Sequence, residues 1–142
     1  MAAELIGVKC HTDDRGFLYQ IYGDFPEKFP DVKRIYVVGN FCKGIIRGFH
    51  MHKKEHKSYF VVNGAAKFVV VDEKKKAYSY VLTSRDSSVL IVPPKHYHGW
   101  VSLEDNTVLI GLSDKSLDES LKDDFRMDPF SFGKELWEVK PR

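Results

Sequence analysis

The sequence predicts an all-β protein built as a sandwich or barrel. Three observations support this: many short segments rich in β-branched and aromatic residues, turn residues between them, and a single segment with a helical pattern. Short strands at regular spacing are typical of antiparallel sandwiches and barrels rather than of alternating β–α units. With 142 residues, 43% of them apolar, and no repeat or linker, we expect one domain over residues 1–142.

Ten strands are expected along the chain. They cover residues 5–10, 17–22, 33–38, 44–52, 57–62, 65–72, 77–83, 88–92, 98–103 and 107–112. Clusters of Gly, Pro, Asn and Asp separate them. Among these turns, Asn63-Gly64 between two apolar runs is the strongest hairpin signal.

A short helix and an ordered tail are expected after the strands. Residues 116–125 read as a helix in which Ser116 is the N-cap and Glu119 completes a capping box. Residues 128–142 are expected to pack on the body, because they include Phe130, Phe132, Leu136 and Trp137.

Composition excludes several classes of partner. The formal net charge is only +2 and the basic residues are interspersed with carboxylates, so we expect no nucleic acid. No apolar run approaches the roughly 20 residues that a membrane helix needs. Residues 1–4 lack the pattern of a signal peptide, and Cys10 and Cys42 are expected to be reduced core residues. The predicted location is therefore the cytoplasm.

Four side chains suited to binding or catalysis are predicted to share one face of a sheet. If residues 53–56 form a hairpin loop, His52 pairs with Lys57 and His50 pairs with Tyr59. Directly opposed residues of paired strands project to the same side. A lone histidine is usually structural, but burying several cations without a purpose is costly. This cluster therefore indicates a functional site.

Under simple alternation along the strand, the side chain of Arg47 would point to the opposite face of the sheet from that of His50. Gly48, directly after it, is a suitable place for a β-bulge, which would turn Arg47 toward the same side as His50.

The same residues resemble the metal-binding motifs of cupins, with one substitution. His50, His52 and His98 match three metal-ligand positions, whereas Lys57 stands where the motif has glutamate. An ammonium cannot ligate a metal ion and repels it, so no metal is expected. A metal-dependent cupin oxygenase that uses the three histidines remains the alternative.

A second resemblance covers nearly the whole chain and implies a cupin-type jelly roll. Motifs similar to those of dTDP-4-dehydrorhamnose 3,5-epimerases occur in order: Asp14-Arg15-Gly16, Arg47-Gly48-Phe49-His50, Lys57 with Gly64, Pro93 to Gly99, and Asp128-Pro129. Residues 32–54 and Leu112-Ser113-Asp114 also resemble dTDP-4-keto-6-deoxyhexose 3,4-ketoisomerases. Both resemblances imply isomerisation of a nucleotide-linked 4-keto sugar in deoxysugar or polysaccharide biosynthesis.

By this resemblance each candidate residue has a role, and no cofactor is needed. His50 removes a proton next to the ketone, Asp128 orients His50, and Lys57 stabilises the enolate oxygen. Arg47 and Arg15 bind the substrate and its diphosphate, with Arg15 supplied by a neighbouring subunit. His98 is a further substrate-binding candidate.

One part of the epimerase site is absent at its expected position. The family's tyrosine acid aligns with Ile110, which leaves Tyr97, Tyr59 or His98 as proton donors. A 3,4-ketoisomerase would instead use the pair His50 and His52 on one face of the sugar. Epimerisation at C3 or C5 is the favoured hypothesis, ahead of ketoisomerisation and of a non-catalytic sugar-binding cupin. A homodimer that exchanges N-terminal strands is also expected.

Overall fold

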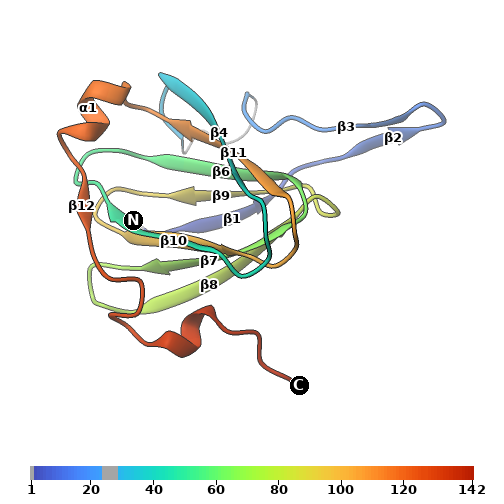
Figure 1. Ribbon diagram of the computed structural model, residues 1–142. Coiled ribbons are helices and arrows are strands. Elements are labelled where there is room, and N and C mark those ends of the chain that lie inside the picture. The colour runs from blue at the N-terminus through green and yellow to red at the C-terminus, as the bar shows by residue number, and fades with distance from the viewer. Residues whose placement is uncertain (1, 24–28) are drawn as a thin grey trace.

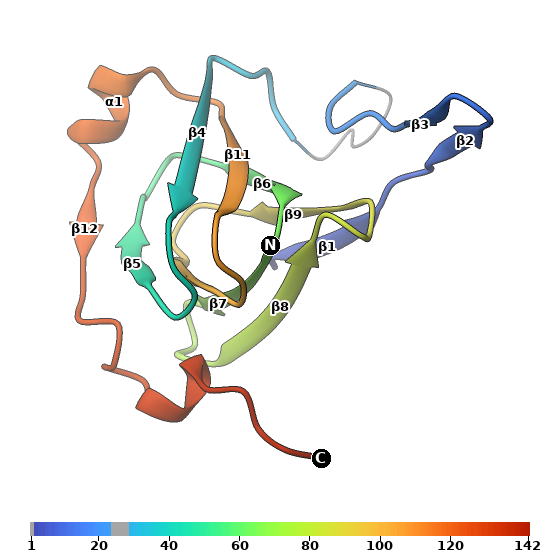
Figure 2. The same cartoon turned by 45° about the vertical axis from the view of Figure 1, so that its right-hand side comes forward.

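The computed structural model describes residues 2–23 and 29–142, and these form two five-stranded antiparallel sheets packed face to face (Figure 1). The first sheet has the order β1-β9-β6-β11-β4 and the second β12-β5-β10-β7-β8. A separate hairpin, β2–β3, projects from the body (Figure 2). The all-β, cupin-like jelly-roll prediction is confirmed.

All ten predicted strands are present, two of them (residues 77–83 and 88–92) with the predicted bounds and the others with shifted ends, and two short strands were missed. The bounds are β1 Glu4–Gly7, β2 His11–Asp13, β3 Gly16–Leu18, β4 Arg34–Asn40, β5 Ile46–Met51, β6 Lys57–Asn63, β7 Ala65–Val71, β8 Ala77–Thr83, β9 Ser88–Val92, β10 Tyr97–Ser102, β11 Thr107–Ser113 and β12 Phe125–Arg126. The missed strands are β2 and β12. They are three and two residues long, too short to show alternation.

The main core lies between the two sheets. Its fully buried members, Val61, Phe68, Val70, Leu90 and Leu109, come from four strands and point inward from both sheets. Burial of each such side chain contributes about 1.5–3 kcal/mol. The core fills only part of the space between the sheets, and polar residues line the remainder.

The predicted hairpin at Asn63-Gly64 is wrong. β6 belongs to the first sheet and β7 to the second, so the chain bends there from one sheet to the other. Gly64 has a φ of +82°, and a Cβ on it would fall 2.5 Å from Oγ1 of Thr107. The residue pair correctly marks a sharp bend, but such a bend serves a sheet-to-sheet crossing as well as a hairpin.

The helix begins as predicted and ends earlier. α1, Leu117–Leu121, has Ser116 as N-cap and a complete capping box with Glu119. The predicted helix extended to residue 125, but Phe125 begins β12, which pairs with β5. None of the described helices is long and apolar enough to span a membrane.

The C-terminal tail packs on the outer side of the second sheet. Its 3-10 helix η1, Lys134–Trp137, places the Trp137 ring 5.2 Å from that of Phe49. The Trp137 indole Nε1 donates a hydrogen bond to the carbonyl of Pro129 at 2.6 Å. An ordered tail was therefore predicted correctly.

The prediction of buried cysteines is wrong. Cys10 and Cys42 are both exposed free thiols. Cys10 lies between β1 and β2, and Cys42 lies in the turn after β4. The strand that precedes each cysteine therefore ends before reaching it, which leaves the thiol at the surface.

Candidate active site

A pocket of about 460 Å³ opens between the sheets next to the main core. Its walls come from β4, β5, β6 and β10, with α1 and β12 at its rim. Six predicted site residues line it: Arg47, His50, His52, Lys57, Tyr59 and His98. The structure therefore brings together most of the residues that the sequence singled out.

These residues converge for a different reason from the one predicted. β5 pairs with β10, and β6 pairs with β9 and β11, so β5 and β6 belong to opposite sheets. The predicted register of His52 with Lys57 is wrong, because residues 53–56 cross between the sheets. His50 and Lys57 meet nevertheless, because the inner faces of the two sheets line the same pocket.

The predicted bulge at Gly48 is confirmed. Trp100 pairs with Arg47 and His98 pairs with His50, so β5 has one more residue than β10 over this interval. A Cβ on Gly48 would lie 2.7 Å from Cα of Gly99, which explains why glycine is needed. The bulge brings Arg47 to the pocket, where its Nε donates to Oδ1 of Asn40 at 2.8 Å.

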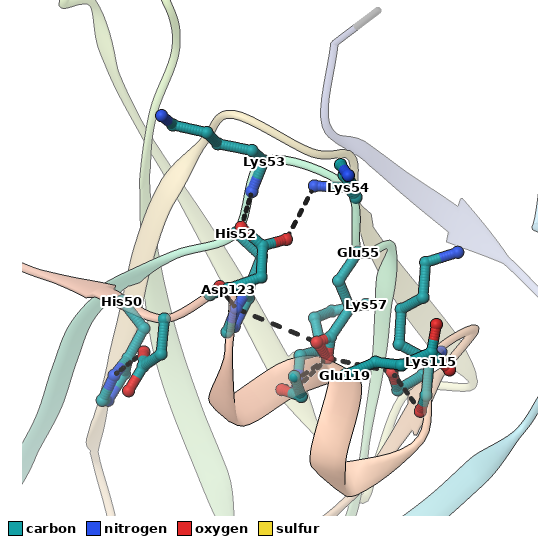
Figure 3. A network of polar contacts seen from close by, with 12 residues as sticks. His50, His52, Lys53, Lys54, Glu55, Lys57, Lys115, Glu119 and Asp123 are labelled. Carbon is teal, nitrogen blue, oxygen red and sulfur yellow. Dashed lines mark hydrogen bonds and ion pairs between the residues drawn. The ribbon is translucent and has the colours of Figure 1, made fainter.

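His50 is suited to act as a base. Burial lowers its pKa below the ordinary 6.5, and the opposing effect of Asp124 is smaller. Its Nδ1 lies 3.7 Å from Oδ1 of Asp124 (Figure 3). At neutral pH the ring is therefore uncharged and holds a lone pair that can accept a proton.

The carboxylate beside His50 is Asp124 rather than the predicted Asp128. β12 pairs with β5 so that Arg126 lies opposite His50, which brings the residue just before β12 to the imidazole. Asp128 lies beyond β12, and its carboxylate accepts the backbone N–H of Phe130 at 2.7 Å in a turn. It does not line the pocket.

His52 is held by the backbone after α1. Its Nδ1 lies 2.5 Å from the carbonyl oxygen of Asp123, and the Asp123 carboxylate accepts the backbone N–H groups of Lys53 and Lys54 (Figure 3). A carbonyl only accepts, so Nδ1 carries the hydrogen. The lone pair of a neutral His52 is therefore at Nε2.

Tyr59 and His98 form a buried pair at the pocket wall. The hydroxyl of Tyr59 lies 2.9 Å from Nε2 of His98, and Nδ1 of His98 lies 3.1 Å from the carbonyl of His96. Burial lowers the pKa of His98 to about 3 and raises that of Tyr59 well above its ordinary value. His98 is therefore neutral, donates from Nδ1 to His96 and accepts from Tyr59. Neither residue has a proton free for a substrate.

A three-histidine metal site does not fit this arrangement. Both ring nitrogens of His98 are already engaged, and Nδ1 of His52 faces a carbonyl. Among the described residues, no group of three His, Cys, Asp or Glu side chains is placed to hold a metal ion.

Besides Asp128, two further predicted site residues lie outside the pocket. Tyr97 precedes His98 on β10, so its side chain points the opposite way and packs in the cluster around Phe49 and Trp137. Arg15 lies at the turn of the β2–β3 hairpin, exposed and paired with Asp13. The figures place this hairpin away from β5 (Figures 1 and 2).

Sequence reasoning missed Tyr36, which reaches the pocket from β4. Its hydroxyl accepts a hydrogen bond from Nζ of Lys57 at 3.2 Å. Its ring occupies the space beside Gly111, where a Cβ would lie 2.3 Å from the ring. Ile110 points to the other side of β11, in the outer cluster with Phe29. A tyrosine hydroxyl therefore reaches the pocket from β4, the strand next to the expected one.

Sequence reasoning also missed Glu55, a fully buried carboxylate beneath Lys57. Its Oε1 lies 3.0 Å from Nζ of Lys57 and 3.3 Å from the guanidinium of Arg34. A glutamate in a polar segment between two strands usually lies at the surface, so the sequence carries no local signal for this role.

Positive charge predominates around the pocket. The lining cations are Arg34, Arg47, Lys57 and Arg126, whereas Asp124 is the lining carboxylate and Glu55 lies behind the wall. A partly enclosed pocket with this charge attracts an anionic ligand such as a phosphate or diphosphate.

Comparison with known proteins places these features in a family. The family described as "FdtA: WxcM-like, C-terminal" matches residues 1–136. Comparison with curated proteins found no match.

Several solved structures share the fold over most of their length. The dTDP-4-dehydrorhamnose 3,5-epimerase from Sulfolobus tokodaii has a TM-score of 0.84 at 27% identity, covering 99% of this chain and 83% of that one. The enzyme of the same name from Bacillus anthracis, with TDP and PPi bound, has a TM-score of 0.83 at 26% identity, covering 98% and 86%. The sugar 3,4-ketoisomerase QdtA from Thermoanaerobacterium thermosaccharolyticum, in complex with TDP, has a TM-score of 0.76 at 27% identity, covering 90% of each chain.

The family match covers far more than half of the sequence, and the fold and pocket agree with it. The chain belongs to the FdtA/WxcM-like C-terminal family.

Proposed function

We propose that this protein is a sugar-nucleotide isomerase that acts on a dTDP-linked 4-keto-6-deoxyhexose without a cofactor. The observation that carries the proposal is that a neutral imidazole, His50, and the Lys57 ammonium line the same cation-rich pocket. The similar epimerase and ketoisomerase structures with TDP bound support a thymidine nucleotide as the carrier.

The chemistry begins with proton removal next to the ketone. His50 takes the proton from the adjacent carbon, and the C–H electron pair forms an enolate whose negative charge lies on the former ketone oxygen. The Lys57 ammonium stabilises that oxygen. Asp124, 3.7 Å from His50, stabilises the imidazolium that forms.

Tyr36 is the proton donor that we propose for the second half of the reaction. Its hydroxyl is 3.2 Å from Nζ of Lys57, and it reaches the pocket from the sheet opposite that of His50. A base and an acid on opposite sides of the substrate invert a carbon centre, because the proton leaves one face and returns to the other. This placement favours epimerisation at C3 or C5.

Ketoisomerisation between C3 and C4 is the second candidate. His50 and His52 project into the pocket from alternate positions of the β5 end, on one side of the substrate. Two imidazoles on the same side suit a transfer of protons between neighbouring carbons.

Incubation with dTDP-4-keto-6-deoxyglucose in D₂O, followed by proton NMR, tests the proposal. Epimerisation exchanges the C3 or C5 hydrogen for deuterium and inverts the centre, whereas ketoisomerisation moves the ketone from C4 to C3. Tight binding without exchange would instead identify a sugar-binding protein. Turnover that requires added metal and oxygen would identify an oxygenase.

We also propose that the protein works as a homodimer in the cytoplasm. In the structure β1 pairs with β9 of its own chain, so the support for a partner comes from other surfaces. Phe17 and Leu18 on β3 are 70% and 59% exposed, and Ile35 and Val37 point outward from the edge strand β4. Such apolar surface indicates an interface with a second copy. The two exposed free thiols suit a reducing compartment.

Mixed dimers test whether Arg15 serves the partner's pocket. Arg15→Ala and His50→Asn are each expected to be nearly inactive alone. Half of a random mixture is heterodimer and one of its two sites is intact, so mixing should restore about a quarter of wild-type activity. Turnover after subunit exchange is the measurement, and the control is His50→Asn mixed with the Arg15→Ala/His50→Asn double variant. No gain on mixing would contradict a shared site.

A further inference from the structure

A buried polar cluster lies behind the pocket wall, centred on Glu55. Oε1 of Glu55 accepts hydrogen bonds from the hydroxyls of Ser113 and Ser120 at 2.9 and 3.1 Å. The same oxygen faces Lys57 at 3.0 Å and Arg34 at 3.3 Å. Figure 3 shows this cluster between β6 and α1.

We propose that Glu55 is a positioning residue of the active site, which holds the Lys57 ammonium in place and aims it at the substrate oxygen. This inference rests on the proposed function, in which Lys57 stabilises the enolate. Glu55 itself does not line the pocket, so it acts through Lys57 rather than on the substrate.

The hydrogen-bond capacity of Lys57 supports this role. An ammonium has three hydrogens. One is directed to Oε1 of Glu55 and one to the hydroxyl of Tyr36. Because Lys57 also lines the pocket, its third hydrogen is left for a ligand.

The charge of Glu55 is maintained although the residue is buried. Burial alone would raise its pKa, but Lys57, His52 and the hydrogen bonds outweigh burial, so the pKa is below its ordinary value. Glu55 is therefore a carboxylate at neutral pH. A buried anion in contact with an ammonium favours the charged form of that ammonium.

The same carboxylate holds the rim of the pocket. Ser120 belongs to α1, and its hydrogen bond to Glu55 fixes the helix whose Leu117 and Leu121 line the pocket. Oε2 has no hydrogen-bond partner and lies 3.9 Å from Nδ1 of His52. Glu55 thus connects β4, β6, β11 and α1 at one point.

Glu55→Gln tests the proposal, because glutamine keeps the size and the hydrogen-bond acceptor but removes the charge. The expected result is a fall in kcat of about 10- to 100-fold with KM changed less than about threefold. Glu104→Gln, which removes an exposed carboxylate paired with Arg85, is the matched control and should change neither.

A double variant separates positioning from general support of the fold. If Glu55 acts through Lys57, Glu55→Gln should add little to the loss already caused by Lys57→Met. An equal loss in both backgrounds would overturn the proposal, as would an unchanged kcat. Should Glu55→Gln not fold, Glu55→Asp replaces it: the carboxylate is kept but displaced, so kcat should fall in the wild-type background and change little in the Lys57→Met background. An unchanged kcat in Glu55→Asp would also overturn the proposal.

An NMR measurement on the free protein keeps this test independent of turnover. The nitrogen-15 signal of the Lys57 side chain should move to a different chemical shift in Glu55→Gln, because the ammonium loses its contact with a carboxylate. If wild type turns over no 4-keto sugar but the signal moves as expected, the proposed function fails and the link between Glu55 and Lys57 stands. If turnover occurs but the signal does not move, the inference about Glu55 fails alone.

Discussion

Replacing His50 with asparagine is expected to lower kcat by about 10³-fold while nucleotide binding changes only a few-fold. Asparagine is close in size to histidine but cannot accept a proton at neutral pH, so the enolate cannot form. The pocket cations that we propose as ligands of the diphosphate, Arg47 among them, are unaffected. Turnover by proton NMR and TDP affinity by calorimetry are the two measurements.

The pH profile supplies a second readout for His50. Only the uncharged imidazole accepts a proton, and burial places its pKa below 6.5. Wild-type kcat/KM should therefore fall as the ring becomes charged, and should reach half of its plateau value only below pH 6.5. His98 adds no limb in this range, because its pKa is about 3.

His56→Asn is the matched control for His50→Asn. His56 pairs with Asp114 at 2.9 Å and does not line the pocket. This substitution should lower the melting temperature, because it removes a partner of Asp114, but leave kcat within about twofold. Equal losses of turnover in both variants, or substantial turnover by His50→Asn, would show that His50 is not the base.

The strands were predictable from the sequence, but their partners were not. Alternating apolar residues identify a strand and its inner face, which is a local property. Asn63-Gly64 and residues 53–56 show equally clearly that the chain turns. Whether the chain returns to the same sheet or crosses to the other depends on contacts far away in the sequence, such as that between Gly64 and Thr107.

The same distinction applies to the site. His50, Lys57 and Tyr59 were placed together correctly because each faces inward, and inward faces meet in a sandwich whichever strands pair. The resemblance placed Asp128 beside His50, but Asp124 lies there, and locating it requires the register of the two-residue strand β12. Tyr97 was also placed wrongly, because it is next to His98 on β10 and its side chain therefore points to the opposite face of the sheet.

The residues that support Lys57 could not be found from local sequence. Tyr36 reaches the pocket only because Gly111, 75 positions away in the sequence, leaves room for its ring. Glu55 lies in a charged connection that is typical of the surface, yet its side chain is fully buried. The position of Tyr36 arises from packing within the first sheet, and that of Glu55 from packing between this sheet and α1.

Replacing Lys57 with methionine is expected to lower kcat by about 10²- to 10³-fold. Methionine is close to lysine in length and apolar, so the pocket keeps its shape but loses the positive charge next to the enolate oxygen. Proton removal by His50 and stabilisation by Lys57 belong to the same step. The rate of deuterium exchange in D₂O should therefore fall by the same factor as turnover.

Lys67→Met is the matched control, because Lys67 donates to the carbonyl of Glu138 at the surface, far from the pocket lining. It should exchange and turn over substrate at wild-type rates. In Lys57→Met, Arg34 still neutralises Glu55, so folding should persist at a lower melting temperature. If folded Lys57→Met still exchanged deuterium at the wild-type rate, Lys57 would not be the group that stabilises the enolate. The base would then work without an ammonium at the oxygen, and the anion would have to be stabilised by Arg34 or Tyr36 instead.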